Sequence, residues 1–401
     1  MKAANAQKAL RVLIVTHVVR DNDGQGRVNY EIARALLAAG HHVTIVSSMV
    51  APELLAHPSV RHVPIRESRL PSRLLQYQMF AIKSGAWIRA HRREFDIVHV
   101  NGFITWTRAD VNAVHFVHDG WYRCGFYPFR LASGWYGAYQ VIYTRLNAWC
   151  ERWAFRRARV VVPVSHKVGE EVRALGIEAA RLRVIHNGVD ARQFSPGASE
   201  RDRFGLPGEP FMLLFAGDLR VSRKNLDAVL RALVSTPAHV HLAVAGILRN
   251  SPYPALAREL GVDDRVHFLD LVKDMPALMR SVDAFVFPSR YEAMSLVMLE
   301  ALAAGLPVIT VATAGGSEVI DGRCGVVLES PEDVEGLARA IERVAHDREY
   351  AREMGRAARE LARTLTWQAM AERYLALYEE IARSGEAKRA QVPEPAMSAR
   401  S

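Results

Sequence analysis

The hydrophobic positions of the chain follow two alternating patterns. Short β-branched runs such as RVLIVTHVV (11–19) and HHVTIVSS (41–48) are typical of buried parallel strands. Between them, YEIARALLAAG (30–40) has the apolar spacing of a helix that ends at Gly40. A strand, a loop, a helix and a further strand form a βαβ unit. The pattern therefore predicts a parallel sheet with helices on its faces.

The same alternation continues along the chain and pauses once. HNGVDARQFSP (186–196) carries Asn-Gly and Ser-Pro turn signals, and the pattern restarts at FMLLFAGDL (211–219). Two Rossmann-like, doubly wound α/β domains are therefore expected. In open parallel sheets, ligands bind beyond the carboxyl ends of the strands, so a cleft between the domains is the expected site. The predicted segments are an N-terminal domain (1–188), a C-terminal domain (189–370), a helix (371–385) and a disordered tail (386–401).

The amino-acid composition is consistent with two domains and indicates the cellular compartment of the protein. The 401 residues, 50% of them hydrophobic, suffice for two domains with large cores. Cys124, Cys150 and Cys324 lie far apart and show no metal or disulfide spacing, so a reducing cytoplasm is expected. The N-terminal apolar run is too short for a signal peptide, and no stretch approaches the ~20 apolar residues of a membrane span.

The chain is basic, with a formal net charge of +9. Such a charge favours nucleic acid, an anionic membrane surface or a phosphorylated ligand as partner. No zinc-finger spacing or RNA-binding signature is present, so nucleic acid is not expected. An anionic membrane surface and a phosphorylated ligand therefore remain as the expected partners of the basic chain.

Residues 291–309, YEAMSLVMLEALAAGLPVI, place two carboxylates in an apolar segment. Glu292 lies in the loop after the strand DAFVFPS (283–289), and Glu300 lies in the body of the helix that follows. The first N–H groups of that helix suit a phosphate, and Glu300 suits a pair of ligand hydroxyls. The alternative is that Glu300 pairs with a neighbouring arginine and that Glu292 is a surface residue. The spacing alone leaves both open.

The order of motifs resembles the retaining GT-B glycosyltransferases of the "glycosyl transferases group 1" family, the Glu-x7-Glu type of family 4. The segment PSRYEAMSLVMLEALAAGLPVI (288–309) carries the central signature. The opening from residue 11, the segment VVVPVSHKVGEEVRALGIEAARLRVIHNGVD (160–190) and TWQAMAERYLALYEEI (366–381) match in the same order. The resemblance implies the GT-B fold, with a C-terminal helix that crosses back to the N-terminal domain.

The resemblance also implies roles for this signature. Glu300 would bind the ribose of a nucleotide-sugar donor, and Glu292 would bind hydroxyls of the transferred sugar as a catalytic residue. Backbone N–H groups near the diphosphate would come from Met294, Ser295, Leu296 and Val297.

A second element, FAGDLRVSRKNLDAVL (215–230), supplies cations for the diphosphate. Arg220, Arg223 and Lys224 follow a strand, where positive charge would stabilise the leaving group. A solvated basic turn is the alternative. Lys224 matches the family's lysine, which we count as catalytic, whereas Asp218 stands where the family has an arginine. Arg220 or Arg223 would have to replace it.

Further candidates lie in the N-terminal half. His118 in HFVHDG (115–120) resembles the family histidine near the reacting carbon and is our catalytic candidate, in preference to His115 or the lower-ranked His99. A satisfied structural histidine is the alternative.

Glycine loops supply the last candidates. Gly24, Gln25 and Gly26 resemble the family's loop beside donor phosphate and acceptor; a plain surface loop is the alternative. Glu318, in the glycine loop AGGSEVIDG (314–322), is a weak candidate that either faces the cleft or caps a turn.

Residues 121–160 interleave aromatic side chains with seven arginines against the single acid Glu151. Such a mixture suits a membrane interface or an acceptor surface. Inward packing of the aromatics is the alternative. We hypothesise peripheral docking on the inner face of the cytoplasmic membrane.

The function implied by the resemblance is transfer of a sugar from a nucleoside diphosphate sugar, UDP- or GDP-linked, to an acceptor hydroxyl with retained configuration. The acceptor would be a saccharide or a lipid-linked molecule of envelope polysaccharide, lipopolysaccharide or glycolipid assembly. The leaving phosphate would accept the acceptor's proton, and no metal or other cofactor is expected. Two alternatives stay open, a catalytically impaired binding or scaffold protein and a nucleotide-sugar epimerase of the same fold; a phosphorylase would need a pyridoxal lysine site that we do not find.

Overall fold

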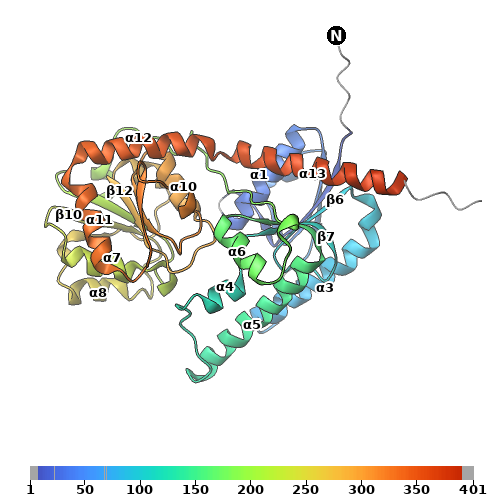
Figure 1. Ribbon diagram of the computed structural model, residues 1–401, viewed down its shortest axis with the longest axis horizontal. Coiled ribbons are helices and arrows are strands. Elements are labelled where there is room, and N and C mark those ends of the chain that lie inside the picture. The colour runs from blue at the N-terminus through green and yellow to red at the C-terminus, as the bar shows by residue number, and fades with distance from the viewer. Residues whose placement is uncertain (1–7, 22, 67, 69, 391–401) are drawn as a thin grey trace, which may run out of the picture. The chain divides into compact units, whose positions relative to one another are not determined.

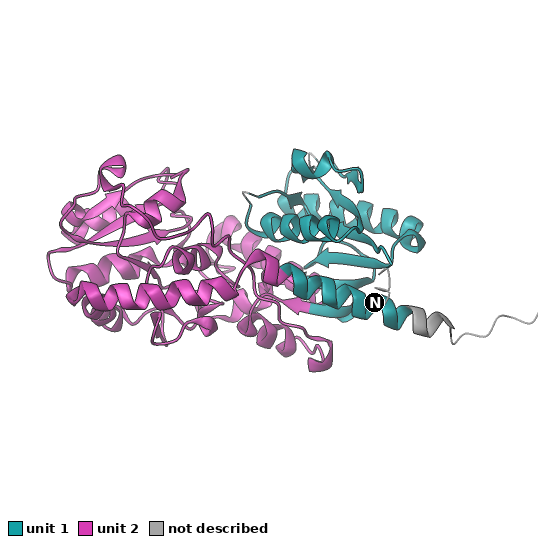
Figure 2. Cartoon of the chain, turned by 90° about the horizontal axis from the view of Figure 1, so that it is seen from above, with its two compact units in different colours: residues 1–113, 154–161, 371–401 teal, residues 114–153, 162–370 magenta. Residues whose placement is uncertain are grey.

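The computed structural model describes residues 8–21, 23–66, 68 and 70–390. The chain divides into two compact units, residues 1–113, 154–161 and 371–401 in one and residues 114–153 and 162–370 in the other (Figure 2). Each unit is described separately below. None of the helices in these described ranges is long and apolar enough to cross a membrane.

The first six-stranded sheet has the order β5-β3-β1-β6-β7-β8, and its register pairs run parallel (Figure 1). Its middle strands are almost wholly buried β-branched runs, as the sequence predicts. The run predicted as a single strand over 11–19 is broken, because β1 ends at Val15 and β2 is a separate pair of residues. The strands are β1 (Arg11–Val15), β2 (Val18–Val19), β3 (His42–Ser47), β4 (Met49–Val50), β5 (Val60–Pro64), β6 (Ile97–Asn101), β7 (Ala109–Val114) and β8 (Ala158–Pro163).

The second six-stranded sheet has the order β11-β10-β9-β12-β13-β14 and is parallel throughout its register pairs. Its topology is the same as that of the first sheet, since in each the first strand of the sheet lies between the second and the fourth. This is the doubly wound order in which ligands bind where the direction of winding reverses. The strands are β9 (Phe211–Ala216), β10 (Val240–Ala245), β11 (Val266–Phe268), β12 (Ala284–Phe287), β13 (Val308–Val311) and β14 (Gly325–Leu328).

Helices connect these strands, and several start at the caps that the sequence supplies. Ser165 caps α6, Ser295 caps α10 and Asp333 caps α11, each accepting a backbone N–H of the first turn. The helices are α1 (Gly24–Ala38), α2 (Pro52–Leu55), α3 (Arg73–His91), α4 (His118–Arg123), α5 (Gly134–Arg157), α6 (His166–Ala174), α7 (Leu226–Val234), α8 (Tyr253–Glu259), α9 (Met275–Arg280), α10 (Leu296–Ala303), α11 (Val334–His346), α12 (Arg348–Thr364) and α13 (Trp367–Ala390).

The predicted domain boundary at residues 188–189 falls in the segment between the last strand of the first sheet and the first strand of the second. From residue 371 onward α13 belongs to the first unit, where the ring of His99 lies 2.6 Å from the hydroxyl of Tyr378. The helix continues through residues 386–390, which the sequence assigned to a disordered tail. The rest of that tail lies outside the described residues.

Candidate functional site

The carboxyl ends of β9 and β12 bring together the residues with the most distinctive chemistry. The two strands are parallel neighbours at the winding reversal of the second sheet. The loop after β9 carries Lys224, and the loop after β12 carries Glu292. Because both loops leave the same edge of the sheet, the two side chains meet, and the ammonium of Lys224 donates a hydrogen bond to Oε2 of Glu292.

This ion pair is largely withdrawn from solvent, with side chains 16% and 15% exposed. Burial acts to raise the pKa of Glu292, but the charges of Lys224 and Arg223 outweigh it, so its pKa lies below the ordinary value. Glu292 is therefore an anion that needs a cation or hydroxyl donors beside it. The surface-loop alternative for Glu292 does not describe this environment.

A network of polar contacts fixes the basic loop that carries Lys224. Arg290 bonds the carboxylate of Asp227 at 2.7 Å, that of Glu332 at 2.6 Å and the backbone oxygen of Ser222 at 2.7 Å. Asn225, buried at φ 65°, donates to the backbone oxygens of residues 288 and 331. Asparagine tolerates this left-handed conformation better than most residues. The loop is therefore held in place independently of the Lys224–Glu292 ion pair.

The two candidate replacements for the missing arginine differ. Arg220 is bound at both ends of its guanidinium by Asp218, with Nε–Oδ1 at 2.8 Å and Nη2–Oδ2 at 2.9 Å. The Asp218 carboxylate therefore neutralises the nearest arginine, and that hydrogen bond lowers the pKa of Asp218. The guanidinium of Arg223 instead lies 5.5 Å from the ring centroid of Phe116. Arg223 is the better supported replacement.

Helix α10 begins at Leu296, shortly after Glu292 in the chain. Ser295 is its N-cap, and its hydroxyl accepts the N–H of Met298. The N–H groups of Leu296 and Val297 precede the first intrahelical bond and so have no acceptor within the helix. Met294 is buried, with its sulfur 3.2 Å from the N–H of Asn187. Glu300 is a partly buried residue in the middle of α10.

A glycine turn packs directly against the Glu292 loop. The N–H of Gly315 donates to the backbone oxygen of Glu292 at 2.9 Å. A Cβ on Gly315 would lie only 2.0 Å from the backbone oxygen of Ala293, so the loop requires glycine there. Glu318 accepts the N–H groups of His166 and Gly316, at 2.7 and 3.0 Å. Its Oε1 also lies 3.3 Å from Nε2 of His186, so the carboxylate of Glu318 joins the glycine turn to the start of α6. A role for Glu318 at the cleft stays a prediction.

His118 is the first residue of α4, which follows the end of β7 at Val114. Its Nδ1 lies 2.7 Å from Oε1 of Glu151, and its backbone N–H donates to Oε2 at 2.9 Å. A carboxylate only accepts, so the ring Nδ1 of His118 donates this hydrogen bond. Glu151 is buried on α5 and fixes the ring.

Glu151 is a site residue that the sequence argument missed, although its position as the lone acid among seven arginines marks it. A second missed group surrounds Tyr291, which is fully buried. Its hydroxyl lies 2.7 Å from Oε2 of Glu171 and 3.0 Å from the backbone oxygen of Val117. Lys167 bonds Glu171 at 2.8 Å and lies 3.9 Å from the centroid of the Tyr291 ring. Burial, followed by Glu171, raises the pKa of Tyr291 well above its ordinary value.

The other two histidines are not equivalent to His118. His115 follows β7, and burial lowers its pKa to about 4, so it is uncharged at neutral pH. His99 is fully buried within β6 of the first unit, between Tyr374 and Tyr378. Both observations agree with the preference for His118.

The glycine loop predicted over Gly24, Gln25 and Gly26 is wrong as local structure, because these residues form the first turn of α1. Asp23 caps the turn and accepts the N–H of Gly26 at 2.6 Å. A Cβ on Gly26 would lie 2.7 Å from Oδ1 of Asp23, so this glycine makes the close cap possible. The turn belongs to the first unit, and its role at donor or acceptor stays a prediction.

Comparison with known proteins assigns the class. Residues 22–193 match the model for Glycosyltransferase Family 4, and residues 198–361 match that for Glycosyl transferases group 1. The chain is 30% identical to the glycogen synthase of Mycobacterium tuberculosis, over 87% of this chain and 89% of the relative. It is 28% identical to the lipopolysaccharide glucosyltransferase WaaG of Escherichia coli K12, over 77% and 83%. The chain belongs to the glycosyl transferases group 1 family and is a glycosyltransferase.

Solved structures show the same fold. Sucrose-phosphate synthase from Thermosynechococcus elongatus superposes with a TM-score of 0.78 at 22% identity, over 94% of this chain and 100% of that one. WaaG, a glycosyltransferase involved in lipopolysaccharide biosynthesis, gives 0.72 at 23%, over 90% and 98%. Anabaena HepE in complex with UDP-glucose gives 0.68 at 18%, over 94% and 100%. The fold is GT-B, with two Rossmann-like parallel sheets, as the sequence predicts.

Proposed function

We propose that this glycosyltransferase moves a sugar from a nucleoside diphosphate sugar to an acceptor hydroxyl with retention of anomeric configuration. The observation that carries the proposal is the Lys224–Glu292 ion pair at the winding reversal of the second sheet. It combines a cation for a leaving diphosphate with an acceptor of sugar hydroxyl protons. A relative of the same fold, Anabaena HepE, has been crystallised with UDP-glucose.

Each half of the donor has a matching element. The basic loop, with Lys224 and Arg223, and the N-terminus of α10 would hold the diphosphate, since positive charge and unbonded N–H groups converge there. Glu300 would accept hydrogen bonds from the ribose hydroxyls. Lys224 and Glu292 satisfy one another in the structure. A bound donor would separate them, giving Lys224 a phosphate and Glu292 hydroxyl donors.

The chemistry that follows needs positioning and charge stabilisation. The cations stabilise negative charge as the glycosidic bond breaks, and the departing phosphate accepts the acceptor's proton on the same face. His118, held by Glu151, would supply Nε2 as a fixed acceptor for a donor-sugar hydroxyl. We propose that the nucleotide sugar is the only small-molecule requirement, so activity should survive removal of divalent cations.

The surface of α5 favours a second proposal, contact with an anionic membrane, which fits a lipid-linked acceptor. Trp135, Ile142 and Trp149 recur every seven residues and are 83%, 57% and 57% exposed. Arginines 145 and 152 follow the same spacing and supply charge for anionic lipid. The inward-packing alternative holds for other aromatics of the segment, such as the fully buried Phe155.

Membrane contact is tested by co-sedimentation with phosphatidylglycerol vesicles at low salt. Trp135→Ser with Ile142→Ser should weaken sedimentation. Leu271→Ser, which alters an apolar side chain 68% exposed outside α5, is the control. No sedimentation of the unaltered protein at low salt contradicts this second proposal.

The main proposal is tested by release of nucleoside diphosphate from UDP-glucose, GDP-mannose and ADP-glucose, each with a panel of saccharide and lipid-extract acceptors and with EDTA present. The coupling constant of the anomeric proton of the product reports the configuration. Acceptor-dependent release with retention supports the proposal. Release without any acceptor indicates the epimerase alternative, and neither release nor nucleotide binding indicates the scaffold alternative.

A further inference from the structure

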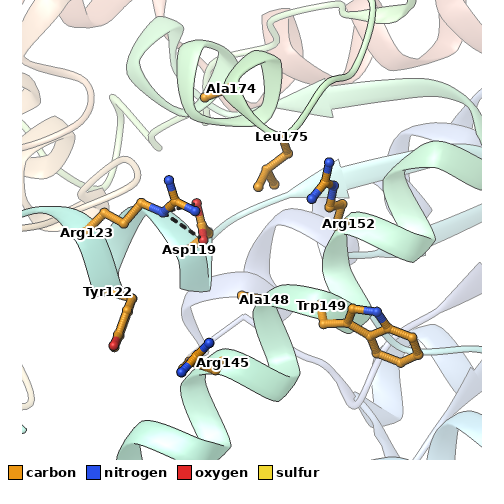
Figure 3. A pocket seen from close by; sticks show the side chains of 9 residues that line it. All are labelled: Asp119, Tyr122, Arg123, Arg145, Ala148, Trp149, Arg152, Ala174 and Leu175. Carbon is orange, nitrogen blue, oxygen red and sulfur yellow. Dashed lines mark hydrogen bonds and ion pairs between the residues drawn. The ribbon is translucent and has the colours of Figure 1, made fainter. Parts of the chain in front are cut away.

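A pocket of about 400 Å³ lies within the second unit (Figure 3). In Figure 3, α4 forms one wall, α5 forms the opposite wall, and the end of α6 lies above them. The lining residues are Asp119, Tyr122, Arg123, Arg145, Ala148, Trp149, Arg152, Ala174 and Leu175.

The charge of the pocket is positive and not fully compensated. Arg123 is paired with Asp119, with Nε–Oδ2 at 3.0 Å. Arg145 and Arg152 have no ion pair or hydrogen bond among the described residues, and both are exposed. Arg145 and Arg152 lie seven residues apart on α5, which is about two helical turns. Two guanidinium groups at this spacing on one helix can bind one multiply charged oxyanion, since each presents several N–H donors.

The remaining lining is suited to an organic group attached to that anion. Trp149 is 57% exposed, Tyr122 is partly exposed, and Leu175 is directed between the two walls in Figure 3. An aromatic face and an aliphatic side chain pack against the apolar face of a sugar or the start of an acyl chain. The volume lies in the range of small-molecule sites, roughly 300–1,000 Å³.

The location relates the pocket to the proposed chemistry. Asp119 directly follows His118 in α4, and Arg152 directly follows Glu151 in α5. The walls of the pocket therefore continue from the residues that hold the proposed catalytic histidine.

We propose that this pocket is an acceptor subsite that binds a phosphate group carried by the acceptor, through Arg145 and Arg152. Its assignment to the acceptor rests on the proposed function, whereas its affinity for phosphate does not. The phosphate belongs either to a soluble phosphorylated saccharide or to the headgroup of a lipid-linked one.

Binding distinguishes these sources. The protein is made in a Lys224→Ala background, which removes one cation of the donor site and so weakens phosphate binding there. Glucose 6-phosphate and inorganic phosphate are titrated by calorimetry, and vesicles of phosphatidylglycerol or of phosphatidylcholine are tested by sedimentation. The test variant is Arg145→Gln with Arg152→Gln. Arg231→Gln, an exposed arginine of α7, is the matched control, and Arg145→Lys with Arg152→Lys keeps the charge.

Saturable binding of glucose 6-phosphate that weakens at least about tenfold in the double glutamine variant, and not in the control, supports a soluble acceptor. Sedimentation with phosphatidylglycerol alone, with the same dependence on both arginines, supports the headgroup source. The lysine variant should retain part of either signal, which excludes misfolding as the cause. Absence of both signals, or equal binding by the glutamine variant, overturns the inference. Donor turnover is measured separately in the protein that retains Lys224. Its failure there, with phosphate binding intact, would instead contradict the proposed function.

Discussion

The carboxylate of Glu151 engages His118 at two points, 2.7 Å from the ring Nδ1 and 2.9 Å from the backbone N–H. One buried side chain thus fixes both the position and the tautomer of the candidate catalytic histidine. Glu151→Gln should lower kcat by roughly 10- to 100-fold, as for other residues that orient a functional histidine, and leave nucleotide affinity unchanged. Steady-state kinetics and nucleotide titration measure the two effects. A loss of nucleotide affinity equal to the loss of kcat would show that Glu151 acts only by maintaining the fold.

Removing one charge of the Lys224–Glu292 ion pair should lower the free energy of unfolding more than removing both charges. Lys224→Met leaves a largely buried carboxylate unpaired, and we expect the free energy of unfolding to fall by about 2–3 kcal/mol. The double variant Lys224→Met with Glu292→Gln removes both charges and should be less destabilised than Lys224→Met alone. Urea denaturation of the unaltered protein, the single variants Lys224→Met and Glu292→Gln and the double variant gives the coupling free energy. Additive losses would contradict a direct interaction.

The lowered pKa of Glu292 fixes the sign of a pH effect. Folding stabilises its ionised form, so its contribution is complete above the unfolded pKa of about 4.5 and is lost as pH falls through the lower folded value. The difference in unfolding free energy between the unaltered protein and Glu292→Gln should therefore shrink only below pH 4.5. Denaturation curves from pH 7 downward measure it. A difference that grows on acidification would contradict the assignment.

The Glu292 loop should also depend on the glycine turn beside it. Gly315→Ala places a methyl group 2.0 Å from the backbone oxygen of Ala293, so either the turn or the loop must move. We expect a loss of at least ~1–3 kcal/mol in unfolding free energy together with weaker nucleotide binding. Gly322→Ala, where no atom lies within 4 Å, is the control and should be neutral in both measurements. Equal effects of the two substitutions would mean that the close contact is unimportant.

Much of the fold was predictable because burial in parallel sheets leaves a strong pattern. The runs over β1, β3, β9 and β12 are almost wholly buried, and the restart after residue 196 separates the two sheets. Element boundaries were less predictable. The run over 11–19, expected as a strand, is divided, because β1 ends at Val15 and β2 holds only Val18 and Val19.

The site was predictable where contacts follow from sheet topology. Lys224 and Glu292 lie in the loops that follow the neighbouring parallel strands β9 and β12, so the strand order brings them to the same edge of the sheet. Glu151 of α5 contacts His118 of α4, and Glu171 of α6 contacts Tyr291 in the loop after β12. These partners lie far apart in the chain, so no local residue spacing predicts the contacts. The ion pair of Asp218 and Arg220 joins residues two apart in the chain, so the sequence allows it to be predicted. The comparison of Asp218 with the family's arginine does not indicate this pairing.

The central claim is that this glycosyltransferase binds a nucleotide donor through Glu300 and the basic loop. The most direct test is thermal stabilisation by UDP, GDP and ADP and their sugar conjugates, for the unaltered protein, Glu300→Ala and the exposed control Glu342→Ala. A ligand that binds only the folded state raises the melting temperature by mass action. The account predicts that one nucleotide raises it by several degrees in the unaltered protein and in Glu342→Ala, but not in Glu300→Ala. Stabilisation of all three proteins alike, or of none by any nucleotide, would contradict it.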